Sequence, residues 1–419
     1  MSPNARRLRS GALLCVAVAW CQSDASASWV LPCLPRPDAS GTAPQRSSSP
    51  VRRRAGPGEL PGLDISTGDL ALGGLLLAFC AAYLPEALGF NGAAYKVGGF
   101  RYFINRGHEA FSEAVHQLAV EYPGYKDDTI FTYFDTFEET LPQLGSAKRH
   151  VRLLDREVTN IYDHKRGLEE RLRASGCNGP DGPFPETYFS AEEALEATSS
   201  SSDALFFAKL PGETGGRGLR VLRREELQQF TNSDYVFQRA VQDLELIDGR
   251  KFVLRYFFLI YDGSLYLHHR AVVIVHGLPY EPQSVDAGVQ FRHNWYEVDA
   301  ADGAYLMTMH KCPQAPRWRA ALARRLAQLA PALQPLLAAT AKQHGTATRY
   351  VLVGGDAVIE GNGDAKLIEF NMYPNLHAEN DLADKDVYVP LLSDALALML
   401  VGQQRPNLQE VIGLEKEKL

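Results

Sequence analysis

Short apolar runs alternate with longer stretches of helical periodicity along the chain from about residue 150 onward. The apolar runs are rich in β-branched and aromatic residues and end at turn-forming residues, as β-strands do. The pattern predicts strands at residues 204–210, 219–222, 235–238, 251–261, 264–275, 351–359 and 366–370. Strands interspersed with helices in this way predict an α+β fold class.

Two of the periodic stretches predict helices of different kinds. Residues 155–175 are highly charged and predict a surface helix. Its apolar side carries Ile161, Leu168 and Leu172. Residues 317–337 carry a leucine stripe interrupted by two prolines and predict a helix packed on the core. The arginines of this second helix are expected to form a solvated face, with a polyanion-binding patch as the alternative: Arg317, Arg319, Arg324 and Arg325.

The first 58 residues have the features of a targeting sequence rather than of a folded domain. Three arginines precede an apolar run at residues 11–20, and small residues follow at 25–27, as in a secretory signal peptide. Residues 28–58 are rich in serine, proline, alanine and arginine and contain no glutamate, which is typical of a disordered transit segment. A second apolar run, at 70–84, is short for a membrane span. It predicts a buried helix or an import signal, with membrane contact as the alternative.

A signal peptide followed by a transit segment and an apolar run resembles the presequences of algae with complex plastids, which implies a plastid location. The alternative is a wrongly assigned start joined to a cytosolic or membrane-associated enzyme. The expected organisation is a presequence at 1–58, an apolar segment with an N-terminal subdomain at 59–150, a main domain at 151–401 that ends with an apolar helix, and a C-terminal tail at 402–419.

Charge and cysteine content narrow the possible functions. The 419-residue chain has a formal net charge of -7 although its first 58 residues are basic, so the remainder is more acidic than the whole. An acidic body lacks the basic surface of a nucleic-acid-binding protein. After residue 100 the sequence has only Cys177 and Cys312. This spacing excludes a disulfide framework and a zinc motif, and it fits a reducing compartment.

A first predicted hairpin brings cations together. Lys251 and Arg255 lie on the same face of their strand, because alternate strand residues share a face. Asp262 and Gly263 are a strong two-residue turn signal, and counting outward from that turn puts Arg255 opposite Arg270. Like charges in opposed positions are unfavourable without an anion between them. The hairpin therefore suggests a phosphate site, with solvated arginines as the alternative.

A second predicted hairpin brings carboxylates together. A four-residue turn would put Glu360 opposite Ala365 and Asp356 opposite Glu369, with Asn371 on the same face. Two carboxylates and an amide that converge from apolar strands repel one another unless a cation binds. Oxygen ligands of this kind suit Mg²⁺. The hairpin therefore predicts a magnesium site.

A glycine-rich loop at residues 212–218 lies between the strand that carries Lys209 and the strand at 219–222. Glycines allow backbone N–H groups to close on phosphate oxygens, and Lys209 and Arg217 can neutralise their charge. The loop matches neither the Walker A pattern nor the dinucleotide-binding pattern. It is a candidate phosphate-binding element.

Taken in order, these segments resemble the ATP-grasp ligases, and within them the tubulin–tyrosine ligase-like family. The resemblance extends over residues 158–376, a little over half of the chain. It is carried by segments 158–165 (VTNIYDHK), 185–188 (PETY), 207–218, 236–241 (VFQRAV), 247–255 (IDGRKFVLR) and 355–371, with Pro374 after the last.

The resemblance implies an ATP-grasp fold in which two α+β subdomains sandwich the nucleotide. The implied nucleotide-binding residues are Lys165, Lys209, Gly215, Gly216, Arg217, Gly218, Gln238, Val241 and Lys251, with the adenine beside Gln238 and Val241. The implied catalytic residues are Lys251, Arg255, Arg270 and Asn294, and the implied Mg²⁺ ligands are Asp356, Glu369 and Asn371. The implied activity is an ATP- and Mg²⁺-dependent ligase that joins a carboxylate to an amine through an acyl phosphate. Its partners would be a free amino acid and a protein or peptide acceptor.

One residue departs from the family pattern. Val253 stands where the family strand has an aspartate, which removes a hydrogen bond to the ribose. Two alternatives stay open: a nucleotide-binding pseudoenzyme or scaffold, and a small-molecule ligase that makes a dipeptide-like product. Tubulin is a possible acceptor but a disfavoured one, because acidic tubulin tails would prefer a basic docking face.

Overall fold

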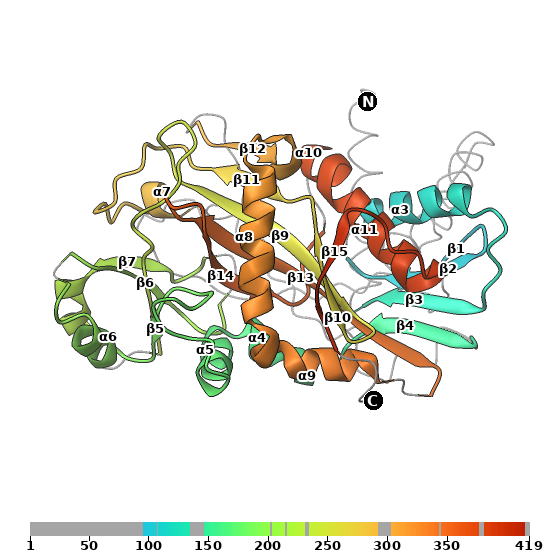
Figure 1. Cartoon of the computed structure of the whole chain (residues 1–419), viewed down its shortest axis with the longest axis horizontal. Coiled ribbons are helices and arrows are strands. Elements are labelled where there is room, and N and C mark those ends of the chain that lie inside the picture. The colour runs from blue at the N-terminus through green and yellow to red at the C-terminus, as the bar shows by residue number, and fades with distance from the viewer. Residues whose placement is uncertain are drawn as a thin grey trace, which may run out of the picture. The chain divides into compact units, whose positions relative to one another are not determined.

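The structure is a computed structural model of the chain (Figure 1). It describes residues 95–106, 108–134, 146–201, 203–213, 216–230, 234–291, 303–342, 345–376 and 381–414. The expected presequence at 1–58 and the apolar run at 70–84 lie outside the described residues.

The described residues form an α+β fold with an eleven-stranded mixed sheet and a four-stranded sheet. The large sheet contains β1 (Tyr95–Val97), β2 (Phe100–Ile104), β3 (Thr129–Tyr133), β4 (Arg149–Leu153), β9 (Phe252–Tyr261), β10 (Ser264–His268), β11 (Val272–Val275), β12 (Tyr305–Thr308), β13 (Ala347–Ile359), β14 (Ala365–Asn371) and β15 (Leu408–Gly413). The small sheet contains β5 (Thr187–Tyr188), β6 (Leu205–Lys209), β7 (Arg220–Arg223) and β8 (Val236–Arg239). The α+β class expected from the sequence is confirmed.

Helices flank both sheets. The α-helices are α3 (His108–Glu121), α4 (Arg156–Asp163), α5 (Lys165–Ala174), α6 (Ala191–Ala197), α7 (Ala287–Gln290), α8 (Ala315–Gln328), α9 (Ala330–Ala341), α10 (Asp381–Ala383) and α11 (Val389–Leu396). Short 3₁₀ segments occupy Arg224–Gln229 and Met309–Lys311, and π-helical segments occupy Asp384–Tyr388 and Ala397–Val401. Within the described ranges, every helix is too short or too polar to cross a membrane.

The large sheet joins a parallel part to an antiparallel part. Strands β2, β3 and β4 run parallel to one another, and β4 is parallel to β13. Beyond β13 the order continues antiparallel through β9, β10 and β15, with β14 on β13 and β11 on β9. The boundary expected between residues 150 and 151 falls inside β4, so the N-terminal strands share this sheet with the rest. The segment expected as a tail, 402–419, contributes β15.

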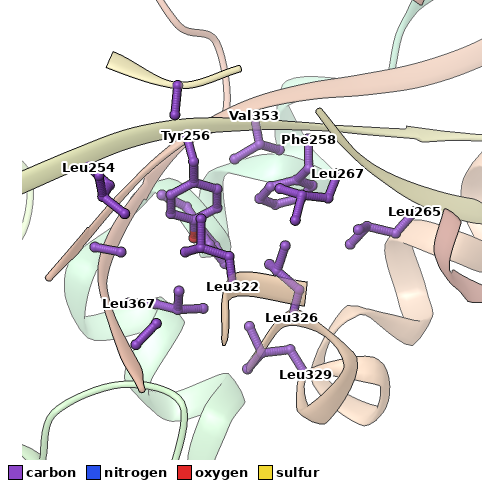
Figure 2. Close-up of a cluster of buried hydrophobic side chains, with 14 of the residues drawn as sticks. Leu254, Tyr256, Phe258, Leu265, Leu267, Leu322, Leu326, Leu329, Val353 and Leu367 are labelled. Carbon is purple, nitrogen blue, oxygen red and sulfur yellow. The ribbon is translucent and has the colours of Figure 1, made fainter. Parts of the chain in front are cut away.

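The alternation of side chains along β9 supplies two hydrophobic cores, one on each face of the sheet. Tyr256 and Phe258 belong to the core covered by α8 and α9, whereas Phe257 belongs to the core covered by α3 and α11. Figure 2 shows Leu322 and Leu326 of α8 directed toward Tyr256 and Phe258. The buried leucine stripe predicted for residues 317–337 is therefore confirmed.

Tyr256 is completely buried in the first of these cores, and among the described residues its hydroxyl has no hydrogen-bond partner. An unpaired buried hydroxyl costs stability. We expect Tyr256→Phe to raise the free energy of unfolding by about 1 kcal/mol in urea titrations. Tyr350→Phe is the matched control, because the buried Tyr350 hydroxyl donates to the Thr132 carbonyl at 2.8 Å. The control should lose about 1 kcal/mol, and equal losses in the two variants would contradict the expectation.

The surface helix predicted at 155–175 is two helices, α4 and α5. The chain turns between them at His164, which has an extended backbone and whose Nδ1 accepts from Gly167 N at 3.3 Å. The two helices pack so closely that a Cβ at Gly167 would lie 2.8 Å from the Ile161 carbonyl oxygen. Leu168 and Leu172 are buried as expected. Ile161 remains 40% exposed, because the turn at His164 gives the two helices different orientations.

The expectation of a solvated arginine face on the 317–337 helix is wrong for Arg325, which is buried. Its guanidinium pairs with Asp364 at 2.8 Å and donates to the carbonyl oxygens of Asp181 and Ala365. A buried arginine is tolerated where its charge and its donors are satisfied in this way. Arg325 thereby anchors the start of β14 to α8.

Candidate functional site

A row of charged residues crosses neighbouring strands of the large sheet. Glu369 on β14 lies opposite Asp356 on β13, which lies opposite Arg255 on β9. The next positions in the row are Val272 on β11 and Thr308 on β12. We call Glu369, Asp356 and Arg255 the charged row. Antiparallel pairing places these side chains on one face, about 5 Å apart between Cβ atoms of neighbours.

The charged row confirms the predicted pairing of Asp356 with Glu369, although the turn count behind that prediction is wrong. Ile359, and not Glu360, pairs with Ala365. The register shifts by one residue between Asp356 and Ala357, so one extra residue on β14 restores the expected alignment. A β-bulge of this kind inserts a residue into one strand and redirects the side chains beyond it.

Arg255 and Asp356 form a two-point ion pair. Arg255 Nε and Nη2 donate to the Asp356 carboxylate oxygens at 2.5 Å and 2.9 Å. Despite burial, the charge of Asp356 raises the pKa of Arg255. Burial raises the pKa of Asp356, an effect that Arg255 opposes. Because Arg255 contacts both oxygens, a cation at this carboxylate would share Asp356 with the guanidinium.

The predicted pairing of Arg255 with Arg270 is wrong. The turn at Asp262 and Gly263 forms as expected, but β10 ends at His268 and Arg255 pairs with Val272 of β11. Arg270 lies in the break between β10 and β11 and donates from Nη1 to the Asp386 carbonyl oxygen at 2.9 Å. The like-charge argument for a phosphate site therefore fails at this pair.

Two buried lysines lie near the charged row. Lys209, at the end of β6, donates from Nζ to Gln238 Oε1 at 2.8 Å. Lys251, just before β9, donates to the Gln290 carbonyl oxygen at 2.7 Å, and its Nζ lies 5.0 Å from the centre of the Phe207 ring. Phe207 is on β6, so this contact joins the small sheet to the large one.

Burial gives both lysines unusual titration. It lowers the pKa of Lys251 to about 7, with a further contribution from the charge of Lys209. Burial also lowers the pKa of Lys209 to about 8, although the charge of Glu369 opposes the shift. Each ammonium has three donors, and each would gain from a nearby anion in a site of low dielectric. The arrangement suits an anionic ligand that touches both lysines.

The described part of the glycine-rich loop is held by Lys165 and by left-handed glycines. Lys165 Nζ donates to the Glu213 carbonyl oxygen at 2.5 Å. Gly216 and Gly218 have φ values of 67° and 70°, which only glycine adopts readily. Arg217 is mostly exposed and pairs with Glu213 at 3.0 Å rather than facing the lysines.

The remaining predicted residues fall into three groups. Gln238, on β8, contacts Lys209 and donates to Thr187 Oγ1 at 3.3 Å, and Val241 follows the same strand. Asn371, at the end of β14, accepts from the Tyr373 backbone N–H at 3.2 Å. Gly215 and Asn294 lie outside the described residues.

Sequence reasoning missed two residues that interact with this site. Gln290 accepts from Lys251 across 39 residues of chain, and Tyr388 interacts electrostatically with Arg255 from the π-helical segment. Neither contact has a local sequence signal, because both depend on where distant segments pack.

The donor set at the charged row fits a hard divalent cation in its chemistry. Asp356 and Glu369 supply carboxylate oxygens and Asn371 an amide oxygen, the ligand types that Mg²⁺ prefers. Within the described ranges, no group of three or more histidine, cysteine, aspartate or glutamate side chains is arranged to hold a metal ion. A cation here would therefore be coordinated by the two carboxylates, the Asn371 amide oxygen and oxygens of a bound molecule.

Comparison with known proteins adds no assignment. No family model matches the chain, and no curated protein matches it.

Proposed function

We propose that the chain is an ATP- and Mg²⁺-dependent carboxylate–amine ligase with an ATP-grasp fold, in which the small sheet and the large sheet enclose the nucleotide. The observation that carries the proposal is that buried Lys209 lies close to the carboxylates of the charged row, with buried Lys251 close to Lys209. Lys209 interacts electrostatically with both Asp356 and Glu369. Cations for a polyphosphate and carboxylates for its metal thus lie together, which is what phosphoryl transfer requires.

Each group of residues has its own role in the proposed site. Lys165, Lys209 and Lys251 bind the phosphates, and Gln238 and Val241 lie at the adenine. Asp356, Glu369 and Asn371 hold Mg²⁺, which supplies charge neutralisation at the phosphates when bound. Arg255 and Arg270 stabilise the transferred phosphoryl group and orient it toward the acceptor carboxylate.

The reaction has two steps. A carboxylate oxygen attacks the γ-phosphorus of ATP, the bond to the β-phosphate oxygen breaks, and ADP leaves an acyl phosphate. The amine nitrogen then attacks the acyl carbon, the bond to the phosphate oxygen breaks, and the amine loses a proton as phosphate leaves. Incubation with ATP, Mg²⁺, each amino acid and candidate acceptors should release ADP and add one residue mass. No ADP and no mass gain with any combination would refute the ligase.

Nucleotide binding should take up protons, because Lys251 and Lys209 titrate near neutral pH when no anion is bound. An anion favours the charged form, so binding raises both pKa values and draws protons from solution. At pH 8 we expect an uptake of about one proton per bound ATP analogue. Calorimetry in two buffers of different ionisation enthalpy measures it. Lys251→Met should reduce the uptake, and proton release by the unaltered protein would contradict the assignment.

A nucleotide-binding protein without catalysis is the second candidate. Val253 lies between Lys251 and Arg255 on β9 and pairs with Ile274, which pairs with Leu306. This apolar row offers no hydrogen bond to a ribose. The second candidate predicts ATP binding without product, whereas a product formed without a protein acceptor would favour a small-molecule ligase.

The acceptor is proposed to be a protein or peptide, with tubulin a possible but disfavoured one, since the chain has a net charge of -7 and the basic residues before residue 59 belong to the proposed plastid presequence. Fusing residues 1–100 to a fluorescent protein tests the location. Signal in the cytosol would remove the plastid proposal and return tubulin to the candidates.

A further inference from the structure

The break between β10 and β11 is a segment with a defined structure. Leu267 pairs with Phe258 and Val272 pairs with Arg255. Between these two pairs, the break has four residues (268–271) where β9 has two (256–257). Extra residues of this kind bend a strand and re-aim side chains, often next to functional sites. Arg270 is one of the four.

His268 holds the break from inside the protein. Its side chain has no exposed surface, and its Nδ1 accepts from the Arg270 backbone N–H at 3.2 Å. Its Nε2 lies 3.2 Å from Asp394 Oδ2. Although burial opposes it, hydrogen bonds from His268 and Asn407 lower the pKa of Asp394. The carboxylate is therefore ionised and accepts the Nε2 proton, which leaves the Nδ1 lone pair toward Arg270.

Asp394 is itself held in place. Arg405 Nη1 donates to Asp394 Oδ1 at 3.2 Å, and Asn407 Nδ2 donates to Oδ2 at 2.9 Å. The Asn407 carbonyl oxygen accepts from His269 N at 2.8 Å, inside the same break. Three hydrogen-bond partners thus fix the Asp394 carboxylate. The carboxylate orients the His268 imidazole, and the imidazole fixes the backbone of Arg270.

The other end of Arg270 is also placed, since its guanidinium donates to Asp386 in the π-helical segment. Tyr388 of that segment interacts with Arg255 of the charged row. We propose that His268, oriented by Asp394, is a positioning residue that fixes Arg270 against the π-helical segment next to the charged row. This inference rests on the proposed function, in which Arg270 stabilises the transferred phosphoryl group. Small displacements of such a group reduce rate strongly.

Two substitutions separate the contacts of His268. The Oδ1 of an asparagine stands at the Nδ1 position and can accept from Arg270 N, whereas a glutamine amide stands at the Nε2 position and can reach only Asp394. We expect His268→Asn to keep kcat within about threefold and His268→Gln to lower kcat about 100-fold at unchanged KM for ATP. Equal losses in both variants, or a loss in His268→Asn alone, would overturn the proposal.

A second measurement is independent of activity. Hydrogen exchange of the Arg270 amide should be as slow in His268→Asn as in the unaltered protein, and about tenfold faster or more in His268→Gln. Thermal unfolding of both variants shows whether their packing losses match. If the unaltered protein makes no product, the proposed function fails while this exchange comparison still decides the role of His268. Equal protection of the Arg270 amide in the two variants would exclude this role for His268.

Discussion

Replacing Glu369 by glutamine is expected to lower turnover of the proposed ligase by about 10³-fold or more, because in that proposal the carboxylate helps to hold a divalent cation, which supplies several kcal/mol to phosphoryl transfer. Glu369 lies opposite Asp356 in the charged row, so the change leaves only one carboxylate there. The substitution is nearly isosteric. Turnover is measured as ADP release and acceptor mass gain at saturating ATP and Mg²⁺.

Glu360→Gln is the matched control for this experiment. Glu360 belongs to the same hairpin, but it lies beyond the end of β13 and its carboxylate is 3.9 Å from Arg325. The control should keep turnover within about twofold, because a weak, partly exposed ion pair contributes little. Full turnover in Glu369→Gln would remove the metal assignment, and equal losses in both variants would point to the hairpin fold instead.

Replacing Gly355 by alanine is expected to destabilise the protein by about 3 kcal/mol. An added Cβ would lie 2.3 Å from Tyr256 Cζ and 2.5 Å from its hydroxyl oxygen. The Tyr256 ring is completely buried, and Figure 2 shows Leu322 of α8 next to it, so it cannot turn away without disturbing the core. Urea unfolding measures the loss, and activity should fall too because Gly355 precedes Asp356 on β13.

Two further variants test this steric explanation. Gly124→Ala adds a methyl group where nothing lies within 4 Å and should change stability by less than about 0.5 kcal/mol. Tyr256→Leu in the Gly355→Ala background should recover about 1 kcal/mol or more relative to the sum of the single losses, since it removes the clashing ring atoms. Additive losses would show that Gly355 is needed for another reason.

The hairpins illustrate what local sequence could and could not predict. The turn at Asp262 and Gly263 was predicted with its first pair correct, because a two-residue turn sets the register of the residues next to it. Farther along, the prediction placed Arg270 opposite Arg255 and failed. His268 and Asp394, 126 residues apart, hold the extra residues of the break, and turn counting has no access to that contact.

Burial was the second limit on prediction from sequence. Arg325 has the spacing of a helix surface residue, yet Asp364 and two carbonyl oxygens from other segments surround it. The alternation along β9 likewise predicted that Lys251 and Arg255 share a face, but not that Lys251 would meet Phe207 of the other sheet. Burial, which the tertiary structure decides, lowers the pKa values of Lys209 and Lys251.

The sequence by itself determined the α+β class and the strands β6, β7, β8, β9, β13 and β14, because alternation and helical periodicity act over a few residues. The opposition of Asp356 and Glu369 was predicted too, but it depends on a β-bulge that compensates for the wrong turn count. Only the tertiary structure decided that Arg255 holds Asp356 with two hydrogen bonds, that Arg270 lies in the break between β10 and β11 and not opposite Arg255, and that two lysines are buried near the charged row. Those features depend on strand order, bulges and desolvation, which arise from contacts between segments far apart in the chain.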